Sequence, residues 1–109
     1  MTHISVYKTS EGKYRGLTCI GHARFAAAGE DIVCAAVSAL VINTNNSLEQ
    51  LAGVKPAAVM NEEEGLLDLR WVADDNDRMQ LLMDSLILGL TGISKQYGKT
   101  YIDLTFEEV

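Results

Sequence analysis

Three residues in the segment GHARFAAAGEDIVCAAVSAL, residues 21–40, have side chains that can act together in nucleophilic catalysis. His22 offers an imidazole base, Cys34 offers a thiol, and Asp31 stands between them. A thiol becomes a strong nucleophile when a neighbouring base accepts its proton. The residue types therefore indicate a Cys-His pair, provided that the intervening chain folds back and brings imidazole and sulfur together.

The local elements expected here favour that approach. Residues 23–29 are rich in glycine and alanine, so the chain can return tightly after His22. A helix is expected to begin at Asp31, whose side chain caps it by accepting the amide N–H of Cys34. This arrangement places the thiol in the first helical turn, where the helix dipole stabilises a thiolate.

Each of the three residues also has a simpler interpretation. A free cysteine is among the residue types most often buried, so Cys34 could be a structural core residue. His22 could be an ordinary loop histidine, and Asp31 a plain helix cap. The coincidence of base, thiol and cap in one place favours catalysis, and a structural Cys34 stays open as the alternative.

Other candidate nucleophiles and ligands carry less weight. Cys19 alternates with its neighbours along an expected strand, which favours a core role. Ser38 lies one turn after Cys34 on the same helix face, where its hydroxyl could serve the substrate or the Cys-His pair, or bond back to its own helix. Neither cysteine belongs to a CxxC pair, and His3 is the only other histidine, so no metal or cofactor is expected.

Two acidic segments are assigned structural roles. ADDNDR, residues 73–78, resembles the start of a calcium loop but lacks the glycine and the twelfth-position acid of that motif, so it is expected to begin a helix. NEEEG, residues 61–65, is expected to form a solvated hairpin tip that could attract a basic partner.

The elements that must position these residues follow from the spacing of apolar side chains. Residues 3–9 and 14–22 alternate on either side of a turn at Gly12, which predicts a hairpin. Helical spacing predicts a helix over residues 31–51, closed by Gly53 and Pro56. Two short strands are expected around residues 61–65.

A second helix and a final strand complete the expected order. The helix follows ADDNDR and ends near Gly98, and residues 100–106 alternate as a strand. Its expected buried stripe consists of Met79, Leu82, Met83, Leu86 and Leu90. The order β-β-α-β-β-α-β predicts an α+β two-layer sandwich, in which one mixed or mostly antiparallel sheet carries both helices on one face.

The first helix is more apolar than one sheet face requires. Residues 32–42, IVCAAVSALVI, carry Ser38 as their only hydroxyl, although a helix packed on one sheet needs apolar residues on one side only. A second covering is therefore expected, from the second helix or from a partner subunit. The apolar run at residues 85–90 raises the same expectation, and we favour a homodimer.

Length, composition and charge bound the class of protein. The 109 residues suit one domain, residues 1–109, and 48% hydrophobic residues with a single proline argue against disorder. The net charge of −6 disfavours nucleic-acid binding, and the apolar runs are too short for a membrane span. With no apolar signal core at the N-terminus and no need for a disulfide, a soluble cytoplasmic protein is expected.

The segment at residues 21–40 resembles the signature of the ribosomal-processing cysteine protease family, called Prp. GHA at 21–23, Gly29 and DIVCAAVSAL at 31–40 carry the resemblance. It implies a bacterial endopeptidase that removes the N-terminal extension of the twenty-seventh large-subunit ribosomal protein, cutting after a hydrophobic segment with an aromatic pair. It also implies a dimer, with Cys34 as nucleophile, His22 as base, and Asp31 and Ser38 in supporting positions.

One alternative function belongs to a different class. A non-catalytic ribosome-assembly or scaffold protein would use Cys34 only as a structural residue. The net negative charge suits a basic ribosomal partner in either case, so it does not separate the two functions.

Overall fold

The structure, a computed structural model, describes residues 2–21, 28–61, 63–72, 76–97 and 101–109. The elements follow in the order β1 (Thr2–Lys8), β2 (Tyr14–Ile20), α1 (Ala28–Leu51), β3 (Ala57–Asn61), β4 (Leu66–Arg70), α2 (Asp77–Tyr97) and β5 (Ile102–Glu108). The order expected from the sequence is confirmed.

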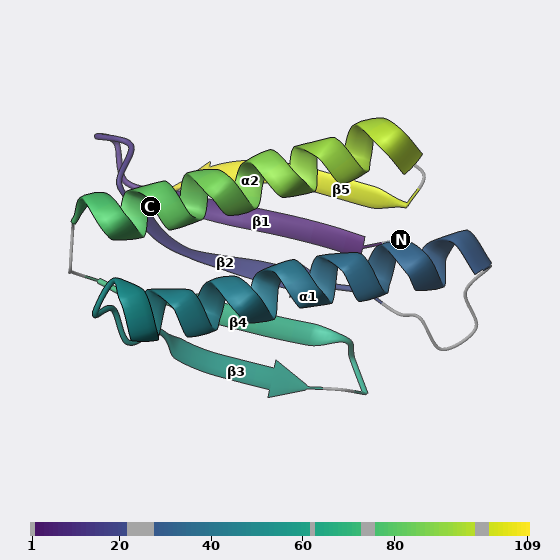
Figure 1. Cartoon of the computed structure of the whole chain (residues 1–109), viewed down its shortest axis with the longest axis horizontal. Coiled ribbons are helices and arrows are strands. Elements are labelled where there is room, and N and C mark those ends of the chain that lie inside the picture. Colours follow the sequence, from purple (N-terminus) through teal and green to yellow (C-terminus); the bar gives the residue numbers. More distant parts are fainter. Residues whose placement is uncertain (1, 22–27, 62, 73–75, 98–100) are drawn as a thin grey trace.

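The five strands form one mixed sheet. Its strand order is β3-β4-β2-β1-β5, and every neighbouring pair is antiparallel except β1 with β5. Both helices lie side by side on one face of the sheet, as Figure 1 shows. The predicted α+β two-layer sandwich is therefore confirmed.

The core fills the space between the sheet and the two helices. Alternate strand residues point toward the helices, because successive side chains of a strand lie on opposite faces. Helix α1 contributes residues spaced by three or four positions, and α2 contributes most of the stripe predicted for it, with Leu82 only partly buried. The fully buried side chains include Ile4, Val6, Leu17, Val33, Val37, Val41, Leu48, Leu69, Met79, Met83 and Leu90.

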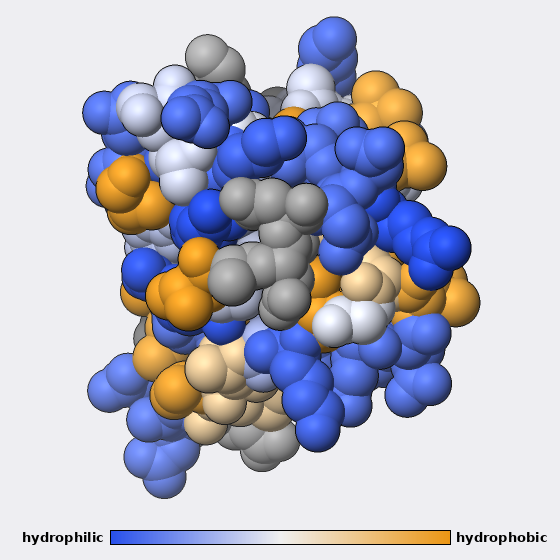
Figure 2. Space-filling view, turned by 90° about the vertical axis from the view of Figure 1, so that its left-hand side faces the viewer, coloured by the Kyte–Doolittle hydropathy of each residue, from blue (hydrophilic) through white to orange (hydrophobic). Residues whose placement is uncertain are grey.

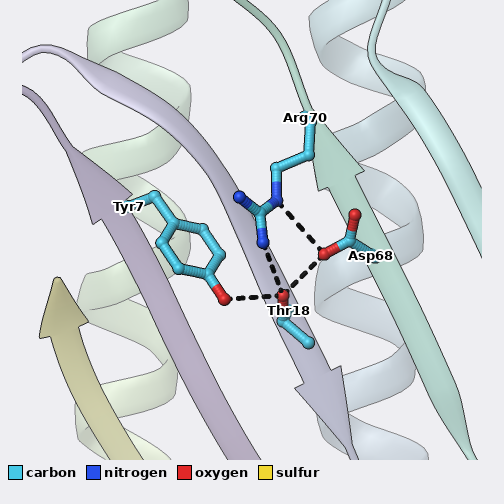
Figure 3. Close-up of polar contacts among 4 residues, drawn as sticks. All are labelled: Tyr7, Thr18, Asp68 and Arg70. Carbon is cyan, nitrogen blue, oxygen red and sulfur yellow. Dashed lines mark hydrogen bonds and ion pairs between the residues drawn. The ribbon is translucent and has the colours of Figure 1, made fainter. Parts of the chain in front are cut away.

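Polar side chains occupy the sheet face that the helices leave uncovered. Thr18 donates a hydrogen bond of 2.6 Å to Asp68, and its Oγ1 lies 2.9 Å from the Tyr7 hydroxyl (Figure 3). Arg70 bonds Asp68 at 3.2 Å, and its guanidinium lies 3.7 Å from the centre of the Tyr7 ring. Gly16 leaves room for the side chain of Arg70 to reach Tyr7, because a Cβ on Gly16 would lie 2.8 Å from Cδ of Arg70. These partners satisfy one another, and they lie on the face away from α1.

Local features fix the start of α2 and the end of α1. Asn76 caps α2, since its Oδ1 accepts the amide N–H of Met79 at 2.8 Å, and its Nδ2 donates to the carbonyl of Ala52 at 3.1 Å. Gly53 follows α1 with a φ of 68°, a left-handed conformation that favours glycine. The helix start predicted within residues 73–78 and the helix end predicted at Gly53 are both confirmed.

The outward side of α1 is only partly covered. Helix α2 packs against α1, and at Gly89 the approach is so close that an added Cβ would lie 3.1 Å from Cδ1 of Leu40. Farther round α1, an apolar stripe stays exposed, which consists of Ile32, Ala35, Ala39 and Ile42. The expected second covering by α2 is thus incomplete.

Figure 2 views the end of the molecule at which α1 ends and α2 begins. Hydrophilic side chains dominate this end, and the apolar ones form separate patches. Cys34 lies toward the other end of α1. Across the described part of the chain, neither helix is long and apolar enough to span a membrane.

Candidate active site

Cys34 lies where α1 meets the first residue of β1. Its side chain is half-buried beside Val33, one of the residues through which α1 packs on the sheet. Its Sγ lies 3.2 Å from Oγ1 of Thr2, a side chain that is only 3% exposed. The thiol therefore combines partial accessibility with a fixed hydroxyl neighbour.

Helix α1 begins at Ala28, not at Asp31. Asp31 lies inside the helix, so the prediction that it is the N-cap is wrong. The chain can extend the helix back through Gly29 and Glu30 because a single glycine costs about 1 kcal/mol and does not prevent helix formation. The side chain of Asp31 lies outside what the structure describes, so its predicted supporting role stays a prediction.

The earlier helix start moves Cys34 into the second turn of α1. With 3.6 residues per turn, a helix that begins at Ala28 completes its first turn before Cys34. The placement of the thiol in the first turn was therefore wrong. Because the dipole effect falls off within the first turn, it stabilises a thiolate at Cys34 less than expected. The polar neighbour from the sheet, Thr2, is therefore more important for the environment of the Cys34 thiol.

The two histidines differ in what the structure says of them. His3 lies on β1 between Thr2 and Ile4, whose side chains face the helices, so His3 points to the opposite face. There its Nδ1 lies 3.3 Å from Oδ2 of Asp103. The sheet separates His3 from Cys34, which excludes His3 as the base. His22 lies outside the described residues.

Two glycines hold the chain just before His22. The amide N–H of Gly21 donates to the carbonyl of Gly65 at 3.1 Å, in the turn between β3 and β4. A Cβ on Gly21 would lie 2.7 Å from Oγ1 of Thr2, and a Cβ on Gly65 would lie 1.7 Å from the carbonyl oxygen of Gly21. Neither Gly21 nor Gly65 can carry a side chain unless the backbone around it moves. The backbone therefore enters the segment that begins with His22 directly beside Thr2.

The remaining predicted residues are placed clearly. Ser38 is exposed on α1, one turn after Cys34. Cys19 is buried on β2, as predicted for a core residue. Burial, and secondly the charge of a Cys34 thiolate, raise the pKa of the Cys19 thiol to about 11. Cys19 is therefore neutral near physiological pH, and a nucleophilic role does not suit it.

Sequence reasoning missed Thr2. The alternation of β1 extends to this residue, so the pattern places Thr2 on the helix-facing side with Ile4 and Val6. No local pattern could show that Cys34, 32 positions away, lies against it. Among the residues that the structure describes, no group of histidine, cysteine, aspartate and glutamate could hold a metal ion.

Comparison with known proteins reveals similarity in both sequence and fold. Residues 1–103 match the family described as Cysteine protease Prp. The Ribosomal processing cysteine protease Prp of Staphylococcus aureus is 28% identical over 99 residues, which cover 91% of this chain and 93% of that protein. The protein of the same name from Bacillus subtilis is 33% identical over 81 residues, which cover 71% and 72%.

A solved structure is similar over nearly the whole chain. It is the crystal structure of an essential ribosomal processing protease Prp from S. aureus in complex with a substrate peptide. Its TM-score is 0.90 at 27% sequence identity, and the match covers 98% of this chain and 100% of that one.

Proposed function

This chain belongs to the cysteine protease Prp family, and we propose that it removes the N-terminal extension of a bacterial large-subunit ribosomal protein, the twenty-seventh, in the cytoplasm. The observation that carries the proposal is the family match over residues 1–103. The half-buried Cys34 thiol at the junction of α1 and β1 supports it, because a cysteine protease needs a thiol that substrate can reach.

The proposed chemistry is acyl transfer by Cys34 and His22. His22 accepts the proton of the Cys34 thiol, and the thiolate attacks the carbonyl carbon of the scissile peptide bond. A carbon–sulfur bond forms, the carbon–nitrogen bond breaks, and the leaving amine takes the proton from His22. Water, deprotonated by His22, then hydrolyses the thioester and restores the thiol.

Asp31 and Ser38 are proposed to support these two residues. Ser38 is exposed one turn after Cys34, where its hydroxyl can donate a hydrogen bond to the substrate. Asp31 stands one turn before Cys34 on the same helix, and we propose that it orients His22.

Negative charge in the turn between β3 and β4 suits a basic substrate. Glu63 and Glu64 are exposed in the turn between β3 and β4, and the same turn binds Gly21 through the carbonyl of Gly65. Carboxylates at this end, together with the net charge of −6, favour the approach of a positively charged ribosomal protein at low salt.

Cleavage of a peptide that spans the end of the extension tests the proposal. We expect two products from a single cut after the hydrophobic segment, identified by mass spectrometry. The control is the same peptide with its aromatic pair replaced by alanine, which should be cut more slowly. Binding of the first peptide without turnover would overturn the proposal and favour the scaffold alternative.

We also propose that the protein is a homodimer that covers the exposed stripe of α1. Ile32 and Ile42 are 57% and 45% exposed within this stripe, and contiguous exposed apolar surface is typical of interfaces. Sedimentation at tens of micromolar is expected to report twice the mass of one chain.

Matched variants locate that interface. Ile42→Asp should shift the protein toward monomer, because it places a charge within the stripe at a distance from Cys34. Val72→Asp changes another exposed apolar residue, on the chain after β4, and should leave the dimer intact. A wild-type monomer would contradict the proposal, and dissociation by both variants alike would contradict this location.

A further inference from the structure

We propose that Thr2 is a positioning residue for the nucleophile: its hydroxyl donates a hydrogen bond to Sγ of Cys34 and favours the thiolate. This inference rests on the proposed role of Cys34 in peptide cleavage. Thr2 Oγ1 lies 3.2 Å from that sulfur, and Thr2 is 3% exposed.

The backbone of Thr2 is fixed on both sides. Its amide N–H donates to the carbonyl of Tyr101 at 2.9 Å, and β1 pairs with β5 so that Thr2 lies opposite Ile102. On the other side, Gly21 packs against the Thr2 side chain. Because the strand holds Thr2 in place and its side chain faces the helices, the hydroxyl is directed at α1.

The chemistry of the two groups sets the direction of the hydrogen bond. A hydroxyl can donate and accept, whereas a thiolate can only accept. Once Cys34 has given its proton to a base, Thr2 must be the donor. Hydrogen bonds to a charged acceptor are stronger than those to a neutral one. The contact therefore stabilises the thiolate more than the thiol.

The position of Cys34 within α1 makes this contact more important. The helix dipole acts mainly in the first turn, and Cys34 lies in the second. Thr2 also lies beside Gly21, the residue directly before His22, since a Cβ added to Gly21 would lie 2.7 Å from Oγ1 of Thr2. One buried side chain thus contacts the nucleophile and lies beside the residue that leads to the proposed base.

Thr2→Val tests this role, since valine keeps the shape of threonine and removes the hydroxyl. We expect alkylation of Cys34 by iodoacetamide to slow about tenfold near neutral pH. At alkaline pH, where the thiol is ionised in both proteins, the two rates should converge. Thr2→Ser keeps the hydroxyl and should restore the wild-type pH profile. For peptide cleavage, kcat should fall and KM should change little.

Thr44→Val is the matched control. Thr44 is also a buried threonine, but it lies on α1, and its hydroxyl donates to the carbonyl of Leu40 on the same helix at 2.8 Å. Its removal should leave the alkylation profile of Cys34 unchanged. Peptide mapping of the buried Cys19 in the same samples reports any loss of the fold, because Cys19 stays unlabelled while the protein is folded.

The outcomes separate this inference from the proposed function. A wild-type pH profile in Thr2→Val, or an equal change in Thr44→Val, would overturn the role of Thr2. Alkylation needs no substrate, so it reports on Thr2 and Cys34 even if the wild-type protein cuts no peptide. Failure of the wild-type protein to cleave the peptide would overturn the proposed function alone.

Discussion

Cys34→Ala is expected to abolish peptide cleavage and to leave the fold intact. Without the sulfur no thioester can form, and removal of a protease nucleophile costs a factor of about 10⁶ in turnover. Cys34 is half-buried, so the loss of one sulfur atom should lower the free energy of unfolding by less than about 2 kcal/mol. Chromatography of the peptide products and a thermal melt measure the two quantities.

The second cysteine and the histidine sharpen this experiment. Cys19→Ala removes the buried thiol on β2 and should keep most of the activity, because burial keeps that thiol neutral. His22→Ala should lose cleavage to a similar extent as Cys34→Ala. Turnover by Cys34→Ala near the wild-type rate would exclude Cys34 as the nucleophile, whereas normal turnover by His22→Ala would exclude only the Cys-His pair.

The sequence predicted those helices and strands in which the burial of one face imposes a regular spacing of apolar residues. Alternation along residues 3–9 and 14–22 reflects one buried face of a hairpin, and the stripe from Met79 to Leu90 reflects one buried face of a helix. Asn76 lies within the segment 73–78 that was predicted to begin that helix, and its side chain caps the helix. These signals are local, so one segment at a time was enough to find them.

The start of α1 could not be found in the same way. The residues before Asp31 include alanine and glutamate, which favour a helix, and no proline marks a boundary. An aspartate before an apolar run has the features of an N-cap, but it serves equally well inside the first turn, where the dipole favours a negative charge. Because of this error Cys34 was expected at a helix end, whereas the structure places it in the second turn of α1, in contact with Thr2 of the sheet.

The contact of Thr2 with Cys34 depends on the order of the strands. It requires β1 to lie inside the sheet between β2 and β5, with the start of α1 above its first residue. Residue types predicted a thiol and an imidazole in one region, because that prediction needs only their proximity in the chain. The hydroxyl partner, Thr2, comes from a segment that is distant in the chain. The spacing of apolar residues within one segment does not report such a contact.

Gly65→Ala is expected to be strongly destabilising and to impair cleavage. A Cβ at this position would lie 1.7 Å from the carbonyl oxygen of Gly21, so the turn between β3 and β4 must move away. That movement breaks the hydrogen bond of 3.1 Å between the Gly21 amide and the Gly65 carbonyl. We expect the free energy of unfolding to fall by about 3 kcal/mol or more, measured by urea with the fluorescence of Trp71, the single tryptophan.

Gly53→Ala separates this contact from backbone strain. The φ angles of Gly53 and Gly65 are 68° and 62°, so both substitutions force alanine into the same left-handed region at a cost of about 1–2 kcal/mol. A Cβ on Gly53 meets nothing within 4 Å. The difference in the free energy of unfolding between the two variants therefore measures the contact with Gly21. Equal destabilisation would show that the backbone around Gly21 and Gly65 moves without cost.

The same two variants also test activity. Gly21 directly precedes His22, so kcat/KM should fall in Gly65→Ala and stay unchanged in Gly53→Ala at a temperature where both are folded. A destabilised Gly65→Ala with wild-type kcat/KM would show that this turn supports the fold without positioning the base.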